Sequence, residues 1–333
     1  MADPARILVI KHSALGDFVL ATASFQAIRR AHPGARIVLL TTKPYVAMAR
    51  ASGLFDDVWT DPRAGLTRPA ALLGVIARLR REGFERVYDL QRSQRTGSYF
   101  TLLRLSLFGR PPEWVGPARG ASHRTTGHTD RRHIAEREAD QLRAAGIEVS
   151  APDLSFLDSD LAGFDLPERI ALLVPGGAPH RPAKRWPAAN FAELGRYLAG
   201  QGITPVLIGT NAEAEEIARI REACPAARDL HGRTGFADLA ALGRRALVTV
   251  GNDTGPMHLI AAAGGPSVVL FSHESDPARI SPRGPWVAIR RKPSLKDLPV
   301  EEVIAALPAL RDAARGGAAD GAPGRGTPQQ GAT

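Results

Sequence analysis

One stretch late in the chain, residues 248–272, constrains the fold more than any other. An apolar run at each end is typical of a buried strand, and a turn and a short helical segment lie between the two runs. Asp253 or Thr254 suits the N-cap of that helix and Pro256 its first position, while glycines 264–265 end it after about two turns. The pattern predicts half of an α/β unit, with a helix opening at the carboxyl end of a strand, where parallel sheets bind ligands.

The start of this helix is suited to bind an anion. Free N–H groups and the positive end of the helix dipole attract negative charge there. Gly255 allows a phosphate to approach the backbone closely, and His258 is placed to donate a hydrogen bond to the same group. An ordinary βαβ turn with a capped helix fits the same spacing, so this stretch by itself leaves both interpretations open.

A second strand, loop and helix begin the chain. Residues 7–11 are predicted as a strand, 12–17 as a turn, 18–32 as a helix and 37–40 as the next strand. The loop has neither G-x-G-x-x-G nor G-x-x-x-x-G-K-[ST], which disfavours dinucleotide oxidoreductases and P-loop NTPases. Asp17 fits a helix-capping carboxylate, worth about 0.3–1 kcal/mol, as well as a catalytic one.

Three motifs, far apart in the sequence, occur together. They are Lys-x-Ser-x-x-Gly-Asp at 11–17, Pro-Gly-Gly followed by Lys-Arg-Trp-Pro at 175–187, and Asp-Thr-Gly-Pro-Met-His at 253–258. In this combination the chain resembles glycosyltransferase family 9, the ADP-heptose:lipopolysaccharide heptosyltransferases, over roughly residues 6–300. The resemblance implies an α/β fold of the GT-B type, in which two doubly wound Rossmann-like domains face a central cleft.

The resemblance also implies roles for individual residues. Asp17 would be the catalytic base and Lys184 would face the donor diphosphate, with no metal and no cofactor. The implied donor-binding residues are Gly177, Lys184, Glu213, Asp253, Thr254, Gly255, Pro256 and His258. The implied acceptor-binding residues are Lys11, Ser13, Gly16, Arg92, Arg95 and Arg124. The donor would be ADP-heptose, although the proline-rich stretch 177–182 offers it fewer hydroxyls than the heptosyltransferases do.

Arginines in the first half of the chain are candidates to meet a phosphorylated acceptor. Arg92 and Arg95 follow Asp89-Leu90-Gln91, which again resembles the family, and residues 114–132 are predicted as a long loop. That loop carries Arg119, Arg124, Arg131 and Arg132. A guanidinium matches a phosphate through two hydrogen bonds. Solvated arginines with no ligand are the alternative.

The chain divides by composition into two domains and a tail. We expect an acceptor-binding domain at 1–155, a donor-binding domain at 156–315 and a disordered tail at 316–333, which has almost no large apolar residue. Asp158-Ser159-Asp160 resembles the D-x-D metal motif of another glycosyltransferase fold. Because it lies in the linker and follows no buried strand, we expect a turn there and no metal site.

Composition narrows the remaining classes of function. The formal charge of +9 favours an anionic partner. No nucleic-acid-binding motif accompanies this charge, so we expect the chain not to bind nucleic acid. No apolar run of about 18 residues and no signal peptide is present, which predicts a cytoplasmic protein with weak peripheral contact with the inner membrane. A nucleotide-sugar epimerase of similar architecture and a non-catalytic anion-binding protein are the rival functions.

Overall fold

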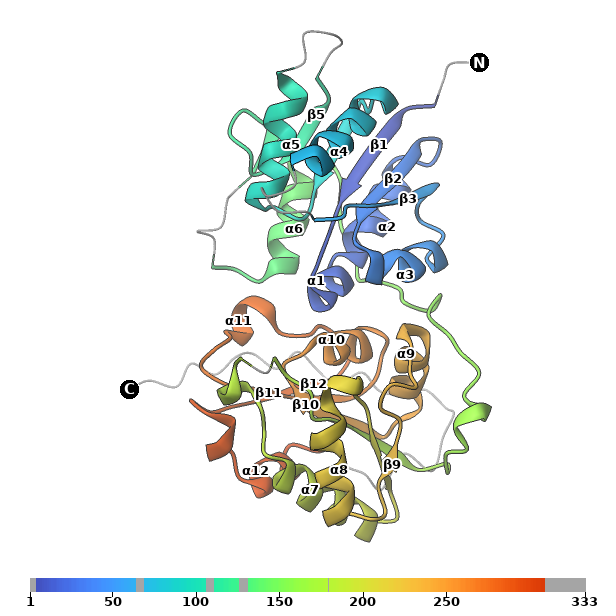
Figure 1. Cartoon of the computed structure of the whole chain (residues 1–333), viewed down its shortest axis with the longest axis vertical. Helices are drawn as coiled ribbons and strands as arrows, with labels where there is room; N and C mark the ends of the chain where they lie inside the picture. Colours follow the sequence, from blue (N-terminus) through green and yellow to red (C-terminus); the bar gives the residue numbers. More distant parts are fainter. Residues whose placement is uncertain (1–3, 64–68, 106–110, 126–130, 179, 309–333) are drawn as a thin grey trace.

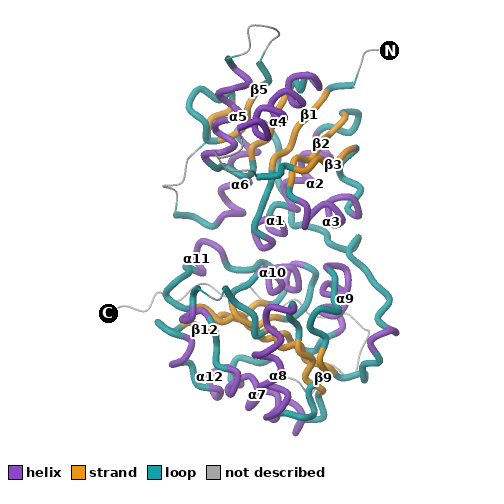
Figure 2. The backbone as a smooth tube through the Cα atoms, in the orientation of Figure 1, coloured by secondary structure: helices purple, strands orange, loops and turns teal. Residues whose placement is uncertain are grey.

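The computed structural model describes residues 4–63, 69–105, 111–125, 131–178 and 180–308 (Figure 1). Within them, two sheets of six parallel strands form two separate Rossmann-like domains, shown in Figure 2. The first domain is built on the order β3-β2-β1-β4-β5-β6 and the second on β12-β11-β10-β7-β8-β9. The doubly wound architecture predicted from the sequence is confirmed, and the tail at 316–333 lies outside the described residues.

The elements of the first domain alternate between strand and helix. Its strands are β1 Arg6–Ile10, β2 Arg36–Thr41, β3 Asp57–Thr60, β4 Arg86–Asp89, β5 Glu113–Gly116 and β6 His123–Arg124. Its helices are α1 Leu15–Leu20, α2 Thr22–Ala31, α3 Val46–Ala51, α4 Pro69–Glu82, α5 Gln94–Arg104 and α6 Ile134–Arg143, with a 3-10 turn at Lys43–Tyr45.

The second domain repeats this pattern. Its strands are β7 Ile170–Val174, β8 Thr204–Leu207, β9 Arg228–Asp229, β10 Val248–Asn252, β11 Ser267–Phe271 and β12 Val287–Arg291. Its helices are α7 Ala188–Gly200, α8 Ala214–Ala223, α9 Phe236–Arg245, α10 Gly255–Ala262, α11 Pro277–Ile280 and α12 Val300–Ile304. Short 3-10 turns lie at Ala162–Phe164, Pro182–Lys184, Asn211–Glu213 and Leu295–Asp297.

Each central strand is apolar on both faces because helices cover both sides of the sheet. In β1, Ile7 and Val9 join the core beneath α1, α2, α3 and α6, whereas Leu8 and Ile10 join the core beneath α4 and α5. Strand order reverses between β1 and β4 in the first sheet and between β7 and β10 in the second. Ligands of doubly wound sheets bind at such switch points, beyond the carboxyl ends of the strands.

Two sequence-based expectations needed correction. The predicted helix at 18–32 starts earlier and is interrupted at Ala21, which separates α1 from α2. The predicted loop at 114–132 contains β5 and β6, because Trp114 and Val115 are buried in opposite cores and β5 pairs with β4.

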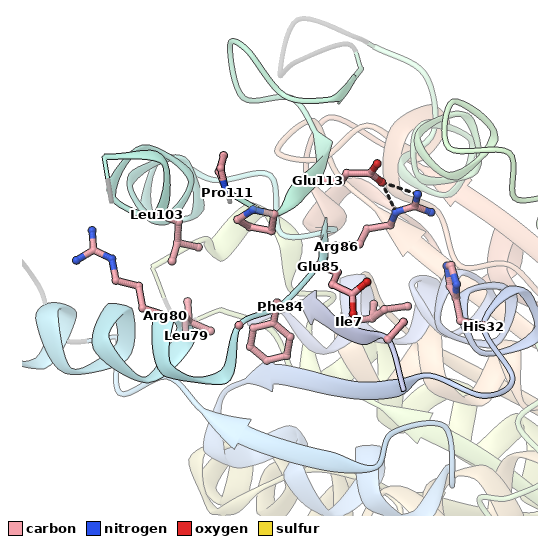
Figure 3. Close-up of a pocket in the computed structure, with 13 residues that line it drawn as sticks. Ile7, His32, Leu79, Arg80, Phe84, Glu85, Arg86, Leu103, Pro111 and Glu113 are labelled. Atoms are coloured by element: carbon pink, nitrogen blue, oxygen red, sulfur yellow. Dashed lines mark hydrogen bonds and ion pairs between the residues drawn. The ribbon is translucent and has the colours of Figure 1, made fainter. Parts of the chain in front are cut away.

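A cavity of about 640 Å³ opens at the amino ends of β1, β4 and β5. Ile7, Phe84 and Leu103 line it, and Arg86 at its rim is held by Glu113 (Figure 3). Because this is the end of the sheet opposite the switch point, the cavity is separate from the predicted ligand loops. Among the helices that the structure describes, none is both long and apolar enough to span a bilayer.

A buried ion pair joins α6 to the end of β1. Lys11 Nζ lies 2.6 Å from Glu138 Oε1, and the two side chains are 2% and 1% exposed. Lys11 Nζ also donates to the carbonyl of Leu90 at 3.2 Å. Burial raises the pKa of Glu138, and Lys11 opposes that rise. Lys11 was predicted to contact the acceptor, but it lies beneath the loop that follows β1 and fixes that loop to α6.

We predict that Glu138→Ala lowers the free energy of unfolding by about 3–5 kcal/mol, because it leaves the ammonium of Lys11 buried without its carboxylate. Urea denaturation measures the change. Glu136→Ala on the same helix is the control, since Glu136 pairs with Arg283 at the surface, where both are about half exposed. Its loss should stay within about 1 kcal/mol. Equal losses in the two variants would show that the buried pair adds no special stability.

Candidate active site at the contact between the domains

The switch points of the two sheets face each other where α1 meets α10 (Figure 1). A Cβ atom built on Gly16 would lie 2.9 Å from Cδ2 of His258, and one built on Gly255 would lie 2.7 Å from Cβ of Leu15. Neither approach leaves room for a side chain. The structure thereby brings the motif at 11–17 into contact with the motif at 253–258, as the resemblance implied.

On the second domain, a lysine and a carboxylate form the centre of the site. Lys184 Nζ donates to Asp253 Oδ2 at 2.7 Å, and Ser275 Oγ donates to the same oxygen at 2.7 Å. Burial acts to raise the pKa of Asp253, but hydrogen bonds from His258, Lys184 and Ser275 hold it below its usual range. Asp253 is therefore an anion that orients Lys184, and its carboxylate does not stand free to meet a phosphate.

Two buried polar atoms beside this pair have no protein partner among the described residues. They are Nδ1 of His258 and Oγ1 of Thr254. The His258 side chain is 7% exposed, and its Nε2 lies 3.7 Å from Asp253 Oδ1. Thr254 is the N-cap of α10 without a capping side-chain bond, and Pro256 follows in the first turn. Since buried polar groups rarely lack partners, these atoms mark a place where a polar ligand would fit.

The loop after β7 is held against this centre by Asn252, which the sequence analysis did not single out. Asn252 Nδ2 donates to the carbonyls of Pro175 and Gly176 at 2.8 and 3.0 Å. Its Oδ1 accepts from the backbone N–H of Trp186 at 3.1 Å. Asn252 thereby fixes both ends of the loop that carries Gly177 and Lys184. Pro179, within that loop, lies outside the described residues.

Glu213, predicted to reach a ribose or sugar hydroxyl, is occupied by its own helix start. Its Oε2 accepts from the backbone N–H of Thr210 at 2.8 Å and from the Thr210 hydroxyl at 2.7 Å. A Cβ atom on Gly176 would lie 3.5 Å from the Glu213 carboxyl carbon, so this carboxyl borders the loop after β7. Glu213 therefore lies beside the loop after β7 and also caps the turn that begins its own helix.

On the first domain, Asp17 is partly exposed in the first turn of α1. Its Oδ2 accepts from the backbone N–H of Ala14 at 3.3 Å, a long bond of the helix-capping type. Both interpretations from the sequence thus remain possible: the carboxylate caps α1, and it adjoins Gly16, which contacts His258.

Gln91 holds the loop that carries Asp17, although it was not named as a site residue. Its Oε1 accepts from the backbone N–H groups of His12 and Ser13 at 2.7 and 3.3 Å. Ser13 Oγ in turn accepts from Arg63 Nη1 at 3.0 Å. Gln91 belongs to the Asp-Leu-Gln motif, which was the only sequence signal that pointed to it.

The arginines proposed for the acceptor do not form one group. Arg95 binds Asp61, with Nη2 at 2.6 Å from Oδ1. Arg92 is only 4% exposed, so it presents little surface to a ligand. Arg124 is exposed on β6, the last strand of the first sheet. Arg63, beside Ser13, is the arginine that the structure places nearest the loop of Asp17, and the sequence analysis passed over it.

Two buried titratable groups lie below these loops. Burial lowers the pKa of His12 to about 4, against the attraction of Asp61, so the imidazole is neutral near pH 7. Burial raises the pKa of Asp89 to about 6, although the backbone N–H of Arg92 donates to it at 2.9 Å. These groups lie beneath the site.

The described residues hold no group of three or more His, Cys, Asp or Glu side chains placed to bind a metal ion. In the predicted turn, Asp158 pairs with Arg244 at 2.9 Å, and Asp160 accepts from the backbone N–H of Ala162 at 2.9 Å. Both carboxylates therefore have structural partners in the linker.

Comparison with known proteins gives a family and a fold. The model of glycosyltransferase family 9 (heptosyltransferase) matches residues 132–299, about half of the chain. Lipopolysaccharide heptosyltransferase 2 of Salmonella typhimurium is 33% identical over 134 residues, which are 39% of this chain and 38% of that protein. The chain thus aligns with only about a third of the length of the curated relatives that it matches.

Two solved structures share the fold over nearly the whole chain. The glycosyl transferase family 9 protein of Veillonella parvula has a TM-score of 0.79 at 20% identity, covering 92% of this chain and 97% of that one. Escherichia coli heptosyltransferase WaaC, solved with ADP-2-deoxy-2-fluoro heptose, has a TM-score of 0.69 at 20% identity, covering 90% and 98%. These likenesses show the GT-B fold that the sequence predicted.

The raised pKa of Asp89 predicts how stability depends on pH. Unfolded aspartate ionises near pH 4, whereas folded Asp89 keeps its proton to about pH 6. Ionisation of Asp89 therefore costs stability as the pH rises from about 4 through 6. Asp89→Asn cannot ionise, so its free energy of unfolding relative to the natural chain should increase by roughly 1–1.5 kcal/mol between pH 5 and pH 8. A difference that stays constant over this range in urea denaturation would contradict the assignment.

Proposed function

The chain belongs to glycosyltransferase family 9, and on that premise we propose that it transfers heptose from ADP-heptose to a phosphorylated lipopolysaccharide-core acceptor, with inversion and without a metal ion. The observation that carries the proposal is the group of Lys184, Asp253 and His258 on the second domain, in contact with the loop of Asp17 on the first. The catalytic loop at 11–17 lies outside the matched residues 132–299, so its role is argued from this contact.

The donor diphosphate binds at the start of α10 in this proposal. Backbone N–H groups of the first turn, together with Lys184 and His258, supply donors for an anion. The unpartnered Nδ1 of His258 and Oγ1 of Thr254 support the same location. Gly255 has no side chain to cover the backbone; Gly177 lies on the loop after β7, and Glu213, which follows β8, borders that loop at Gly176.

Asp17 acts as the general base. It takes the proton of an acceptor hydroxyl while that oxygen bonds to the anomeric carbon, and the bond from this carbon to the diphosphate oxygen breaks. Lys184, His258 and the N-terminus of α10 stabilise the negative charge on the departing diphosphate. No covalent intermediate is needed, since attack and departure take place on opposite faces of the sugar.

The donor and the acceptor enter when the two domains separate. In the present contact, Gly16 lies against His258 and Leu15 lies against Gly255, which covers the start of α10. We therefore place a step of opening and closing in each cycle, as the separation of base and diphosphate site on two domains requires. On the acceptor side, Ser13 and Gly16 lie in the same loop as Asp17, and Arg63 donates to Ser13 Oγ at 3.0 Å.

The acceptor is attached to a lipid in this proposal, so the enzyme works at the cytoplasmic face of the inner membrane and contacts it weakly. Attraction between a chain of formal charge +9 and an anionic leaflet supports such contact. An epimerase would release a free altered sugar without any acceptor, so product analysis with and without acceptor separates the two reactions.

Asp17→Asn should reduce the turnover number at least about a hundredfold, because a positioned general base contributes about 10²–10⁴-fold. Donor affinity and melting temperature should stay nearly unchanged. Asp238→Asn is the matched control, because Asp238 has the same place in the first turn of α9 and accepts from the backbone N–H of Gly235 at 2.8 Å. If Asp17 only caps α1, the two variants will both keep near-normal turnover, and the mechanism is refuted.

Lys184→Ala should weaken the binding of ADP about ten- to a hundredfold, since a charge-assisted hydrogen bond is worth about 1.5–3 kcal/mol. Isothermal titration calorimetry measures the affinity. Lys292→Ala is the control, because Lys292 lies in the second domain and pairs with Glu302 at 2.7 Å, with both side chains partly exposed. Unchanged ADP affinity in Lys184→Ala would remove this lysine from the donor site.

A further inference from the structure

The outer face of α4 is unusual for a helix that meets water. Ala70 and Ala77 each lie three or four positions from both Leu73 and Gly74, which places these four exposed positions on one side of the helix. Leu73 is 59% exposed. Along the first two turns this side carries no charged or polar side chain.

Basic residues continue the same surface. Arg78, Arg80 and Arg81 are exposed in the last turns of α4, and Arg78 also stacks on Trp59 with its guanidinium carbon 3.6 Å from the ring centre. α4 has no acid before Glu82, which lies 3.1 Å from Arg36. The helix therefore presents an apolar half followed by a cationic half.

α5 extends this surface sideways. It lies beside α4 on the outer side of the first domain (Figure 1), and Arg80 Nη2 donates to the carbonyl of Leu102 at 2.5 Å. Leu105 directly follows α5 and is 68% exposed. Leu73 and Leu105 have the highest exposure of the large hydrophobic side chains among the described residues. The α4–α5 face, as defined here, consists of Leu73, Ala77, Arg78, Arg81, Arg104 and Leu105.

We propose that the α4–α5 face docks on an anionic lipid surface. Apolar side chains that enter the headgroup region, flanked by arginines that meet lipid phosphates, are the chemistry of peripheral attachment. Charge complementarity selects this occupant over a second copy of the chain, which would bring the same arginines against one another. Docking rests on the proposed function in one respect: its purpose would be to hold the enzyme beside a lipid-linked acceptor.

The position of the face agrees with that purpose. α4 and α5 cross from the carboxyl ends of β3 and β4 to the amino ends of β4 and β5. Leu73, in the first turns of α4, therefore lies toward the edge of the sheet where Asp17 lies, whereas the arginines and Leu105 lie toward the opposite edge. A bilayer against this face would lie beside the first domain. It would not cover the contact between α1 and α10. The acceptor-binding side would then adjoin the membrane while the domains remain free to separate.

The test is co-sedimentation of the full chain with vesicles of phosphatidylcholine alone or with about a third phosphatidylglycerol. We expect at least about fivefold stronger partition onto the anionic vesicles, since one arginine near such a surface contributes roughly fivefold. Leu73→Glu should reduce that partition about tenfold, and Arg81→Glu several-fold. Tyr197→Glu is the control, because Tyr197 is 38% exposed on α7 of the second domain, and it should bind as the natural chain does.

Two outcomes would overturn the proposal: equal binding of Leu73→Glu and the natural chain, or equal binding to neutral and anionic vesicles. A dimer in analytical ultracentrifugation that Leu73→Glu dissociates would also overturn it, by assigning the face to a second copy. Transfer to a soluble acceptor without lipid should be unchanged in Leu73→Glu. A chain that binds anionic vesicles as expected but transfers no sugar would refute the proposed function and leave the docking surface standing.

Discussion

The site depends on a backbone approach that only glycine permits. Gly16 and Gly255 stand where α1 and α10 touch, and a Cβ atom on either would collide with the opposite domain. Each glycine adjoins a residue of the proposed chemistry, since Asp17 follows Gly16 and Thr254 precedes Gly255. One contact therefore sets the distance between the proposed base and the proposed diphosphate site, although the two belong to different domains and are more than 230 positions apart in the chain.

The loops that form this contact are held in place by polar side chains from other parts of each domain. Gln91 and Asn252 have equivalent positions in the two domains, each at or after the central strand next to the switch point, and each holds a ligand loop by its side-chain amide. The buried pair of Lys11 and Glu138 anchors the first loop to α6. Each domain thus holds its loop at the contact by polar bonds to backbone groups, which is how precise sites are usually supported.

The alternation of strands and helices, and the loops at the ligand edge of each sheet, were predictable because hydrophobic periodicity is a local property. The sequence analysis expected the helix after β10 to start near Thr254 and to stop at Gly264, and the structure has α10 at Gly255–Ala262. Trp114 was assigned to a loop, because the four-residue strand β5, with three buried residues, is too short to show a recognisable alternation in the sequence.

Partners that lie far apart in the sequence were not predictable. The sequence around Lys11 does not distinguish a lysine that binds an acceptor from one that pairs with a buried glutamate 127 positions away. The packing of α6 against the loop after β1 determines which of the two occurs. Ser275 reached Asp253 from the loop after β11, where no motif marked it. Arg95 similarly has a structural partner in Asp61, from the end of a different strand. The spacing of motifs along the sequence predicts which loops come together. The direction in which each side chain points depends on residues that pack against it in the folded domain.

The carboxylate of Asp253 has a consequence for the end of the catalytic cycle. Without a ligand, Lys184 is already neutralised by Asp253 at 2.7 Å, so a bound diphosphate must compete with a partner that never leaves. An isolated lysine would hold the nucleoside diphosphate product more tightly and slow its departure. In the proposed reaction, Asp253 would therefore act as an internal counter-ion of Lys184 and ease the departure of the nucleoside diphosphate product.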